Sequence, residues 1–101
     1  MMTDTVGTRL SDAAITKRLM ALSSWTREGE AIRREFTFES FSDAVAFANR
    51  VALEAERADH HPDILIRFRC VTLVYATHSA SGLTEKDFDG ARMAERVADV
   101  P

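Results

Sequence analysis

The stretch 64–77 constrains the fold more than any other part of the sequence. It is rich in β-branched and aromatic residues, which favour β-strands. A single strand that ended at His78 would hold 15 residues and span about 50 Å, whereas a domain of about 100 residues has a radius of gyration of only about 13 Å. The stretch must therefore fold back on itself. We predict a hairpin with strands at roughly 64–68 and 71–77 and a turn near Arg69-Cys70.

Two segments before this hairpin have the pattern of amphipathic helices. Ser11 is placed to cap a short helix over 12–22, where apolar residues recur at helical spacing. Ser40 and the acidic residue three positions later resemble a capping box in front of a longer helix of about 18 residues. The alanines on the inner face of that helix predict close packing against a sheet. The helix should end near 58–59, because Pro62 disfavours helical backbone at the residue before it.

The segment between these two helices predicts another hairpin. Gly29 readily adopts the positive backbone angle of a tight turn. Apolar and polar residues alternate after it, with Arg34 as the exception on a largely apolar face. We therefore predict strands over 23–27 and 30–38.

The last segment predicts a third helix and completes the topology. Thr84 and Asp87 form another capping box, and the apolar residues after them extend a helix to about Ala98. The order α-β-β-α-β-β-α predicts an α+β fold, with three helices packed on one face of a four-stranded antiparallel sheet. We expect residues 10–101 to form a single domain and residues 1–9 to be a loose N-terminal segment. Because the other face or the edge of the sheet needs protection, we also expect a homo-oligomer.

The composition excludes several classes of protein. The formal net charge of -3 argues against direct binding of nucleic acid. A single cysteine cannot form an internal disulfide framework or a multi-cysteine zinc site. The N-terminus lacks the apolar core of a signal peptide, and no stretch approaches the roughly 20 apolar residues of a membrane span. We therefore expect a cytoplasmic protein with no membrane partner.

Histidine occurs at three positions, and two of them are adjacent. His60 and His61 follow a predicted helix end and precede Pro62, which favours extended backbone there. His78 follows the last predicted strand and precedes a Ser/Gly-rich loop, a common location for functional groups. A histidine taken alone is best explained as a surface residue or a hydrogen-bonded core residue. Taken together, the three predict one shared site.

Such a cluster suits general acid–base chemistry, because imidazole titrates near neutral pH. One ring can remove a proton while another delivers one, as elimination of water requires, and each transfer typically contributes about 10²–10⁴ in rate. A zinc site is the rival explanation, but the adjacent His60 and His61 diverge in an extended segment and are awkward ligands. We therefore expect no metal. Cys70 is better explained as a small core residue than as a nucleophile.

The spacing of these residues also resembles a family signature. The pattern is Glu56-x-x-x-His60-His61-Pro62, then Phe68, then His78 and Asp87. It is similar to the signature of the pterin-4a-carbinolamine dehydratases, and Trp25 and Phe36-x-Phe38 also occur in the expected order. The resemblance covers nearly the whole chain from Leu10.

The resemblance implies an activity and an assembly. Members of that family form dimers or tetramers and dehydrate 4a-hydroxytetrahydropterin to quinonoid dihydropterin, which recycles tetrahydrobiopterin for aromatic amino acid hydroxylases. No metal or organic cofactor is implied, because the pterin is the substrate. Carried over by position, the catalytic residues would be His60, His61 and His78. The residues expected to flank the pterin are Asp59, Pro62, Ala76, Thr77, Ser79 and Asp87.

The resemblance leaves a second role open and shows two departures. Some members act as dimerisation cofactors of a transcription factor, as coactivators or as assembly factors, largely apart from catalysis. Ile64 stands where many members carry an aromatic residue, often Trp, and its lack of a stacking surface predicts weaker pterin binding. Lys86 stands where many members carry Arg. All three histidines are present, so the resemblance implies that the activity survives. Asp87 is expected either to orient His78, to bind the pterin ring amides or only to cap its helix.

Overall fold

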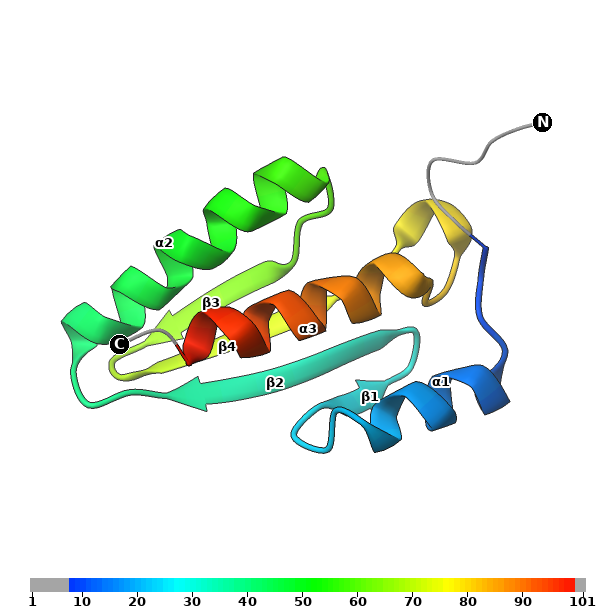
Figure 1. The fold of residues 1–101 in the computed structure, drawn as a ribbon, viewed down its shortest axis with the longest axis horizontal. Helices are drawn as coiled ribbons and strands as arrows, with labels where there is room; N and C mark the ends of the chain where they lie inside the picture. The colour runs from blue at the N-terminus through cyan, green and yellow to red at the C-terminus, as the bar shows by residue number, and fades with distance from the viewer. Residues whose placement is uncertain (1–7, 100–101) are drawn as a thin grey trace.

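The computed structural model describes residues 8–99 and confirms the predicted order of elements (Figure 1). Its elements are α1 (Asp12–Met20), β1 (Thr26–Glu28), β2 (Ala31–Thr37), α2 (Phe41–Ala58), β3 (Asp63–Arg67), β4 (Cys70–Tyr75), a short 3₁₀ helix η1 (His78–Ala80) and α3 (Glu85–Ala98). Most of the predicted N-terminal segment, residues 1–7, lies outside the described residues. Among the described residues at the start of the chain, Arg9 pairs with Glu30 at 2.8 Å, and the amide of Leu10 donates to the carbonyl of Leu83.

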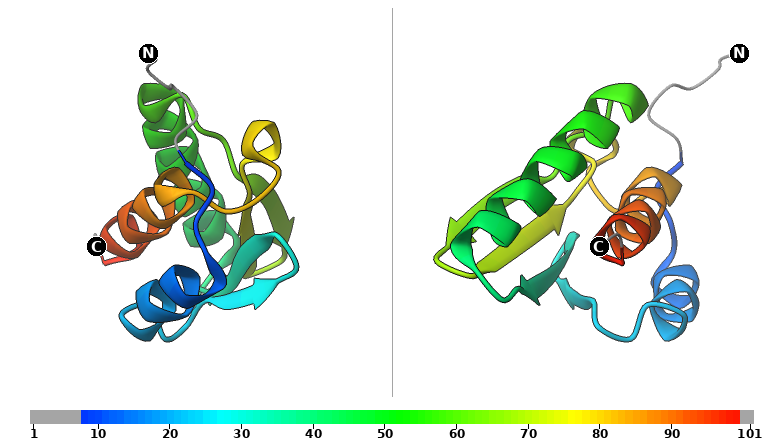
Figure 2. Two further views of the ribbon diagram at one scale, coloured as in Figure 1. Left: turned by 90° about the vertical axis from the view of Figure 1, so that its right-hand side faces the viewer. Right: turned by 60° about the vertical axis from the view of Figure 1, so that its left-hand side comes forward.

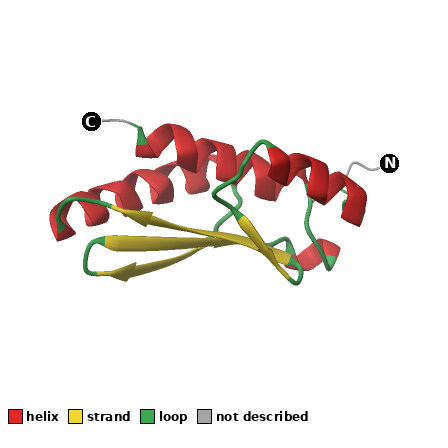
Figure 3. Cartoon of the chain, turned by 90° about the horizontal axis from the view of Figure 1, so that it is seen from below, coloured by secondary structure: helices red, strands yellow, loops and turns green. Residues whose placement is uncertain are grey.

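The four strands form one antiparallel sheet in the order β1-β2-β4-β3. The two central strands pair over their length, with Ile32 opposite Tyr75 and Phe36 opposite Val71. The short β1 and the longer β3 are the two edges. The three α-helices lie on one side of this sheet, as predicted, and Figure 3 shows them above the strands. The views in Figure 2 show α2 and α3 side by side, with α1 beyond β1.

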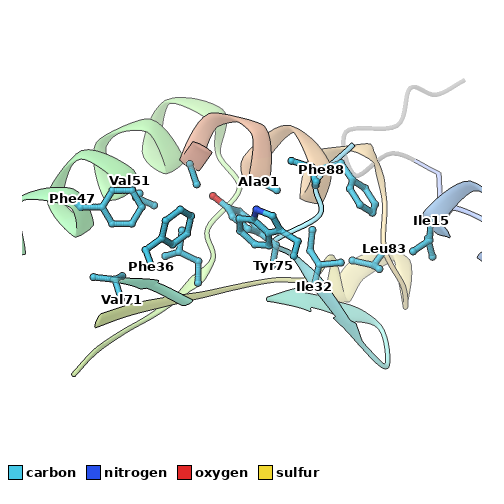
Figure 4. Close-up of a cluster of buried hydrophobic side chains, with 14 of the residues drawn as sticks. Ile15, Ile32, Phe36, Phe47, Val51, Val71, Tyr75, Leu83, Phe88 and Ala91 are labelled. Atoms are coloured by element: carbon cyan, nitrogen blue, oxygen red, sulfur yellow. The ribbon is translucent and has the colours of Figure 1, made fainter. Parts of the chain in front are cut away.

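A continuous apolar core fills the space between the sheet and the helices (Figure 4). Alternation along β2 and β4 directs Ile32, Phe36, Val71, Leu73 and Tyr75 to this side, and all five are buried. The helices contribute the rest of the core, including Ile15, Phe47, Val51, Phe88 and Ala91.

Arg34, the polar exception on the apolar face of β2, is explained by its neighbours. Its guanidinium lies 4.1 Å from the ring centroid of Phe36 and pairs with Glu95 of α3. Glu95 also accepts a hydrogen bond from Nε1 of Trp25 at 2.9 Å. One carboxylate therefore connects the first hairpin to the last helix.

The helix starts follow the predicted caps. Ser11 accepts from the amide of Ala14, Ser40 accepts from the amide of Asp43, and Thr84 forms a full capping box with Asp87. The long helix ends at Ala58, as expected.

Several predicted boundaries were wrong by one to three residues. The second hairpin turns at Phe68-Arg69, one residue earlier than predicted, and Phe68 adopts a left-handed conformation with φ 52°. β4 ends at Tyr75 rather than 77, because the chain turns at residue 77 into the η1 helix, where we had predicted a loop. In the first hairpin, β1 begins only at Thr26, since the amide of Trp25 is still hydrogen-bonded in a turn to the carbonyl of Leu22.

Gly90 marks the closest approach of α3 to the sheet. A Cβ atom at residue 90 would lie 2.4 Å from both Cε1 and Cζ of Tyr75. The Tyr75 ring has little room to retreat, because its centroid lies 6.2 Å from that of Trp25 and 5.8 Å from that of His60. Glycine is therefore required here by packing.

Replacement of Gly90 by alanine is expected to lower the free energy of unfolding by about 1–3 kcal/mol, the usual cost of overpacking. This loss of stability is opposite to the effect of helix propensity, which favours alanine over glycine by about 1 kcal/mol. Urea unfolding followed by Trp25 fluorescence measures the change. Asn49→Ala, at an exposed position of α2, is the matched control and should be neutral or slightly stabilising. A Gly90→Ala variant as stable as this control would contradict the close contact.

Candidate active site

The three histidines lie in segments that enter or leave the sheet at the same end. Asp63, the first residue of β3, pairs with Val74 near the end of β4. The segment that holds His60 and His61 therefore approaches β3 at the same end at which the chain leaves β4 toward His78. Antiparallel pairing thus brings together residues that are far apart in the sequence.

His60 is held by a buried hydrogen-bond network around Asp87. Nε2 of His60 lies 2.7 Å from Oδ1 of Asp87, and the two side chains are 14% and 0% exposed. The other oxygen, Oδ2, accepts from the hydroxyl of Thr77 at 2.8 Å and from the amide of Thr84 at 2.9 Å. The Thr77 and Thr84 hydroxyls lie 2.9 Å apart. The carboxylate therefore joins the end of α2, the end of β4 and the start of α3.

The donors and acceptors of this network assign the proton of His60. A carboxylate only accepts hydrogen bonds, so Nε2 of His60 must carry a hydrogen. This leaves Nδ1 as the atom that can accept a proton. The Thr77 hydroxyl donates to Asp87, so the Thr84 hydroxyl donates to Thr77 and accepts from the amide of Lys86 at 3.2 Å. Each polar atom that faces Asp87 or joins the two threonines has a partner, which favours one fixed geometry.

Tyr75 supports the other side of the His60 ring. The two rings are stacked, with centroids 5.8 Å apart and an interplanar angle of 20°. Burial, and then the nearby charge of Asp87, raise the pKa of the Tyr75 phenol far above its ordinary value. The hydroxyl of Tyr75 is therefore neutral over the whole range in which histidines titrate.

His61 has a carboxylate of its own but lies in solvent. Its Nε2 contacts Oε2 of Glu56 on the last turn of α2, and the two side chains are 52% and 76% exposed. Glu56 therefore lies against the ring of His61 while most of its side chain remains in solvent.

His78 is also exposed and begins η1. It lines a cavity of about 320 Å³ together with Ala76 and Thr77. His60 lines a different cavity, between α2 and α3. The structure thus brings His60 and the residue before His78 onto one carboxylate, but it places the His60 and His78 side chains in separate cavities.

The other predicted site residues surround this end of the sheet. Asp59 is the exposed, left-handed C-cap of α2, with φ 52°, and Pro62 is half-buried. Ser79 is exposed within η1. Asp87 is buried and contacts His60 and Thr77. Ile64 lies on the exposed edge strand.

Tyr75 and Thr84 also contact this cluster, and neither was predicted as part of the site. Tyr75 could have been found from its alternation with Leu73, which directs both side chains to the helices. Nothing in the sequence shows that its ring stacks on His60. Among residues 8–99, no group of three histidine, cysteine or acidic side chains is arranged to hold a metal ion. None of the helices in that range is long and apolar enough to cross a membrane.

Comparison with known proteins places this geometry in a family. Residues 8–97 match the model of the family described as pterin 4 alpha carbinolamine dehydratase. A protein of Roseiflexus sp. (strain RS-1) is 53% identical over 92 residues, which cover 91% of this chain and 99% of the relative. A protein of Nocardia farcinica is 52% identical over 89 residues, which cover 88% and 94%. The names of both relatives provisionally assign them to the pterin-4-alpha-carbinolamine dehydratases.

Solved structures agree with this assignment. The transcriptional coactivator/pterin dehydratase from Brucella melitensis superposes with a TM-score of 0.87 at 39% identity, over 90% of this chain and 99% of that one. A pterin dehydratase-like protein, described as a RuBisCO assembly factor in the alpha-carboxysome, has a TM-score of 0.63 at 19% identity and is similar in fold alone. On this family match and these relatives, the chain belongs to the pterin-4-alpha-carbinolamine dehydratase family.

Proposed function

We propose that this protein dehydrates 4a-hydroxytetrahydropterin to quinonoid dihydropterin in the recycling of tetrahydrobiopterin, with histidines as general acid and base. One observation carries the proposal: in a chain of the dehydratase family, each of the two adjacent histidines has its own carboxylate. His60 pairs with Asp87 and His61 with Glu56. A carboxylate orients the imidazole and stabilises the cation that forms when the ring accepts a proton.

In this proposal the three histidines differ in exposure and in how firmly their rings are held. His61 and His78 are exposed and can reach a bound pterin, one to take a proton and the other to deliver one to the departing hydroxyl. His60 is fixed by Asp87 and supports the site from the buried side, since Asp87 also binds Thr77, which lines the cavity beside His78. The cavity beside His78 is within the size range of small-molecule pockets. The pterin would be flanked by Asp59, Pro62, Ala76, Thr77 and Ser79, and Asp87 would act through His60.

The proposal is tested by the rate of water loss from 4a-hydroxytetrahydropterin. The wild-type protein should accelerate this reaction, and His61→Ala should remove about 10²–10⁴ of the acceleration. Lys17→Ala, on the exposed side of α1, is the control and should leave the rate unchanged. Elemental analysis should find no stoichiometric zinc, since no metal or organic cofactor takes part. If the wild type gives no acceleration, the dehydratase assignment fails.

We also propose that the protein is a homodimer joined along the free edge of β3. All five residues of this strand are exposed, including Ile64, Leu65 and Ile66. The strand is complementary to itself: antiparallel pairing about Leu65 places Ile64 opposite Ile66 and Asp63 opposite Arg67 of the second copy. Such pairing would satisfy the free backbone groups of the edge and bury its apolar side chains.

Sedimentation at micromolar concentration is expected to show a dimer or a tetramer built from such dimers. Leu65→Lys puts two lysines directly opposite each other across the two-fold axis and should shift the protein toward monomer. Met20→Lys removes an exposed apolar side chain of α1 instead and should leave the association unchanged. A monomeric wild type would exclude this assembly.

A non-catalytic binding role is the second candidate. It is favoured by the exposed apolar side chains outside the histidine cluster, such as Leu53 of α2, and by the Brucella melitensis relative, whose description includes transcriptional coactivator. A partner captured equally well by the wild type and by a variant without the three histidines would support it. Loss of capture in that variant would tie binding to the histidine site instead.

A further inference from the structure

The hydroxyl of Tyr75 is a polar group that the dehydratase proposal does not use. The side chain is 1% exposed, and its hydroxyl has no hydrogen-bond partner among the described residues. Figure 4 shows its oxygen directed from β4 toward the two long helices. Buried polar atoms in proteins are nearly always hydrogen-bonded, so each exception calls for a specific explanation.

A cavity of about 470 Å³ lies between α2 and α3 at this hydroxyl. Its apolar walls include Ala55, Ala58 and Met93, and Tyr75 and His60 lie at its inner end. Gly90 opens the cavity to the phenol, because a Cβ atom there would lie 2.9 Å from the hydroxyl oxygen. This volume is within the range of sites that bind small molecules. We call this cavity the α2/α3 groove.

The charges around the α2/α3 groove favour an anion. Its lining contains three cations, Arg57, Lys86 and Arg96, and two carboxylates, Glu54 and Asp89. Both carboxylates already pair with an arginine, Glu54 with Arg57 and Asp89 with Arg92. Arg96 has no ion-pair partner within residues 8–99. The groove is thus positive by one charge in a chain whose net charge is -3.

We propose that the α2/α3 groove binds a small organic carboxylate. The neutral phenol of Tyr75 donates a hydrogen bond to a carboxylate oxygen, and the rim cations, Arg96 above all, balance the charge. The apolar body of the ligand lies over Ala58 and Met93, where a flexible thioether adapts to its shape. The donor, the cations and the apolar walls all select the same class of ligand.

An occupant of this groove would contact His60, which lines it and stacks on Tyr75. Binding would therefore alter the environment of a histidine assigned to the dehydratase site. This consequence rests on the proposed function. The binding itself does not, so the two can fail separately.

The test is a titration of the ¹⁵N-labelled protein with phenylacetate. The amides of Ala58, Gly90 and Met93 should shift and saturate. Phenylethylammonium has a similar body and the opposite charge, and it should give no saturable shift. Inorganic phosphate has a charge but no apolar body, and it should bind at least tenfold more weakly.

Two variants separate this site from adventitious binding. Tyr75→Phe keeps the ring and removes the donor, and Arg96→Gln removes the unpaired cation. Each should weaken phenylacetate binding about 3–10-fold, whereas Arg33→Gln, on the opposite face of the sheet, should not. Absence of saturation, wild-type affinity in both variants, or phosphate binding as tight as that of phenylacetate would each overturn the proposal. A dehydratase assay of the same samples reports separately on the proposed function.

Discussion

Replacing Asp87 by alanine is expected to lower the free energy of unfolding by about 3–5 kcal/mol. The change removes one acceptor from three donors at once: the ring of His60, the hydroxyl of Thr77 and the amide of Thr84. All three lie at a side chain that is 0% exposed, so water cannot easily replace the carboxylate. A loss of this size is a large part of the 5–15 kcal/mol by which domains are usually stable.

The measurement is urea unfolding followed by Trp25 fluorescence. Asp89→Ala is the matched control, because Asp89 lies two residues further along α3, its side chain is 71% exposed, and it forms a surface ion pair with Arg92. The control should change stability by no more than about 0.5 kcal/mol. Equal effects of the two substitutions would show that Asp87 is only a helix-capping residue.

Asp87→Asn tests the chemistry of the same network with less damage to its packing. The amide oxygen can still accept from Thr77 and Thr84, but the amide nitrogen now donates to His60. Nε2 of His60 must then become the acceptor, and its hydrogen moves to Nδ1. Because Asp87 acts through His60 in the proposed mechanism, the dehydration rate should fall by about 10²–10⁴ while the fold is kept. The ¹⁵N shifts of the ring show the tautomer directly, and an unchanged tautomer would contradict the assignment of the network.

The helices could be predicted because their ends depend on local chemistry. Ser11, Ser40 and Thr84 cap the three helices through side chains that lie within three residues of the groups they bond. The turn of the second hairpin could be placed only approximately, because Phe68 occupies a left-handed position that glycine or asparagine usually signals. There the pairing of β3 with β4 overrides the local preference.

The contacts of the histidines could not be predicted from the sequence. His60 and His61 are neighbours in sequence, yet one is half-buried and the other exposed, as extended backbone with alternating side chains requires. The carboxylate of His60 is 27 residues away, and only the packing of α3 against the sheet brings it there. The Thr84-x-x-Asp87 pattern correctly indicates a helix cap. It contains no sign that the same carboxylate also holds a histidine.

Tyr75 is the one tyrosine of the chain, and it is expected to ionise only when the protein unfolds. Burial and the charge of Asp87 raise its pKa in the folded state, whereas in the unfolded chain a tyrosine ionises at about pH 10. This contribution to stability is therefore fully present below pH 10. It is lost as pH rises toward the pKa of the folded state, because the unfolded state releases the proton first. The loss should reach about 1.4 kcal/mol per pH unit.

In one alkaline titration, tyrosinate absorbance follows the ionisation of Tyr75 and Trp25 fluorescence follows unfolding. Both signals should change together, because burial and the charge of Asp87 disfavour the phenolate as long as the Tyr75 ring is packed under Gly90. Tyr75→Phe removes the unpartnered hydroxyl and should be about 1 kcal/mol more stable at neutral pH. Its advantage over the wild type should grow above pH 10, because it has no phenol to titrate. Tyrosinate absorbance that appears before Trp25 responds would mean that the phenol ionises in the folded protein, and Tyr75 would then no longer be the neutral neighbour of His60 assigned above.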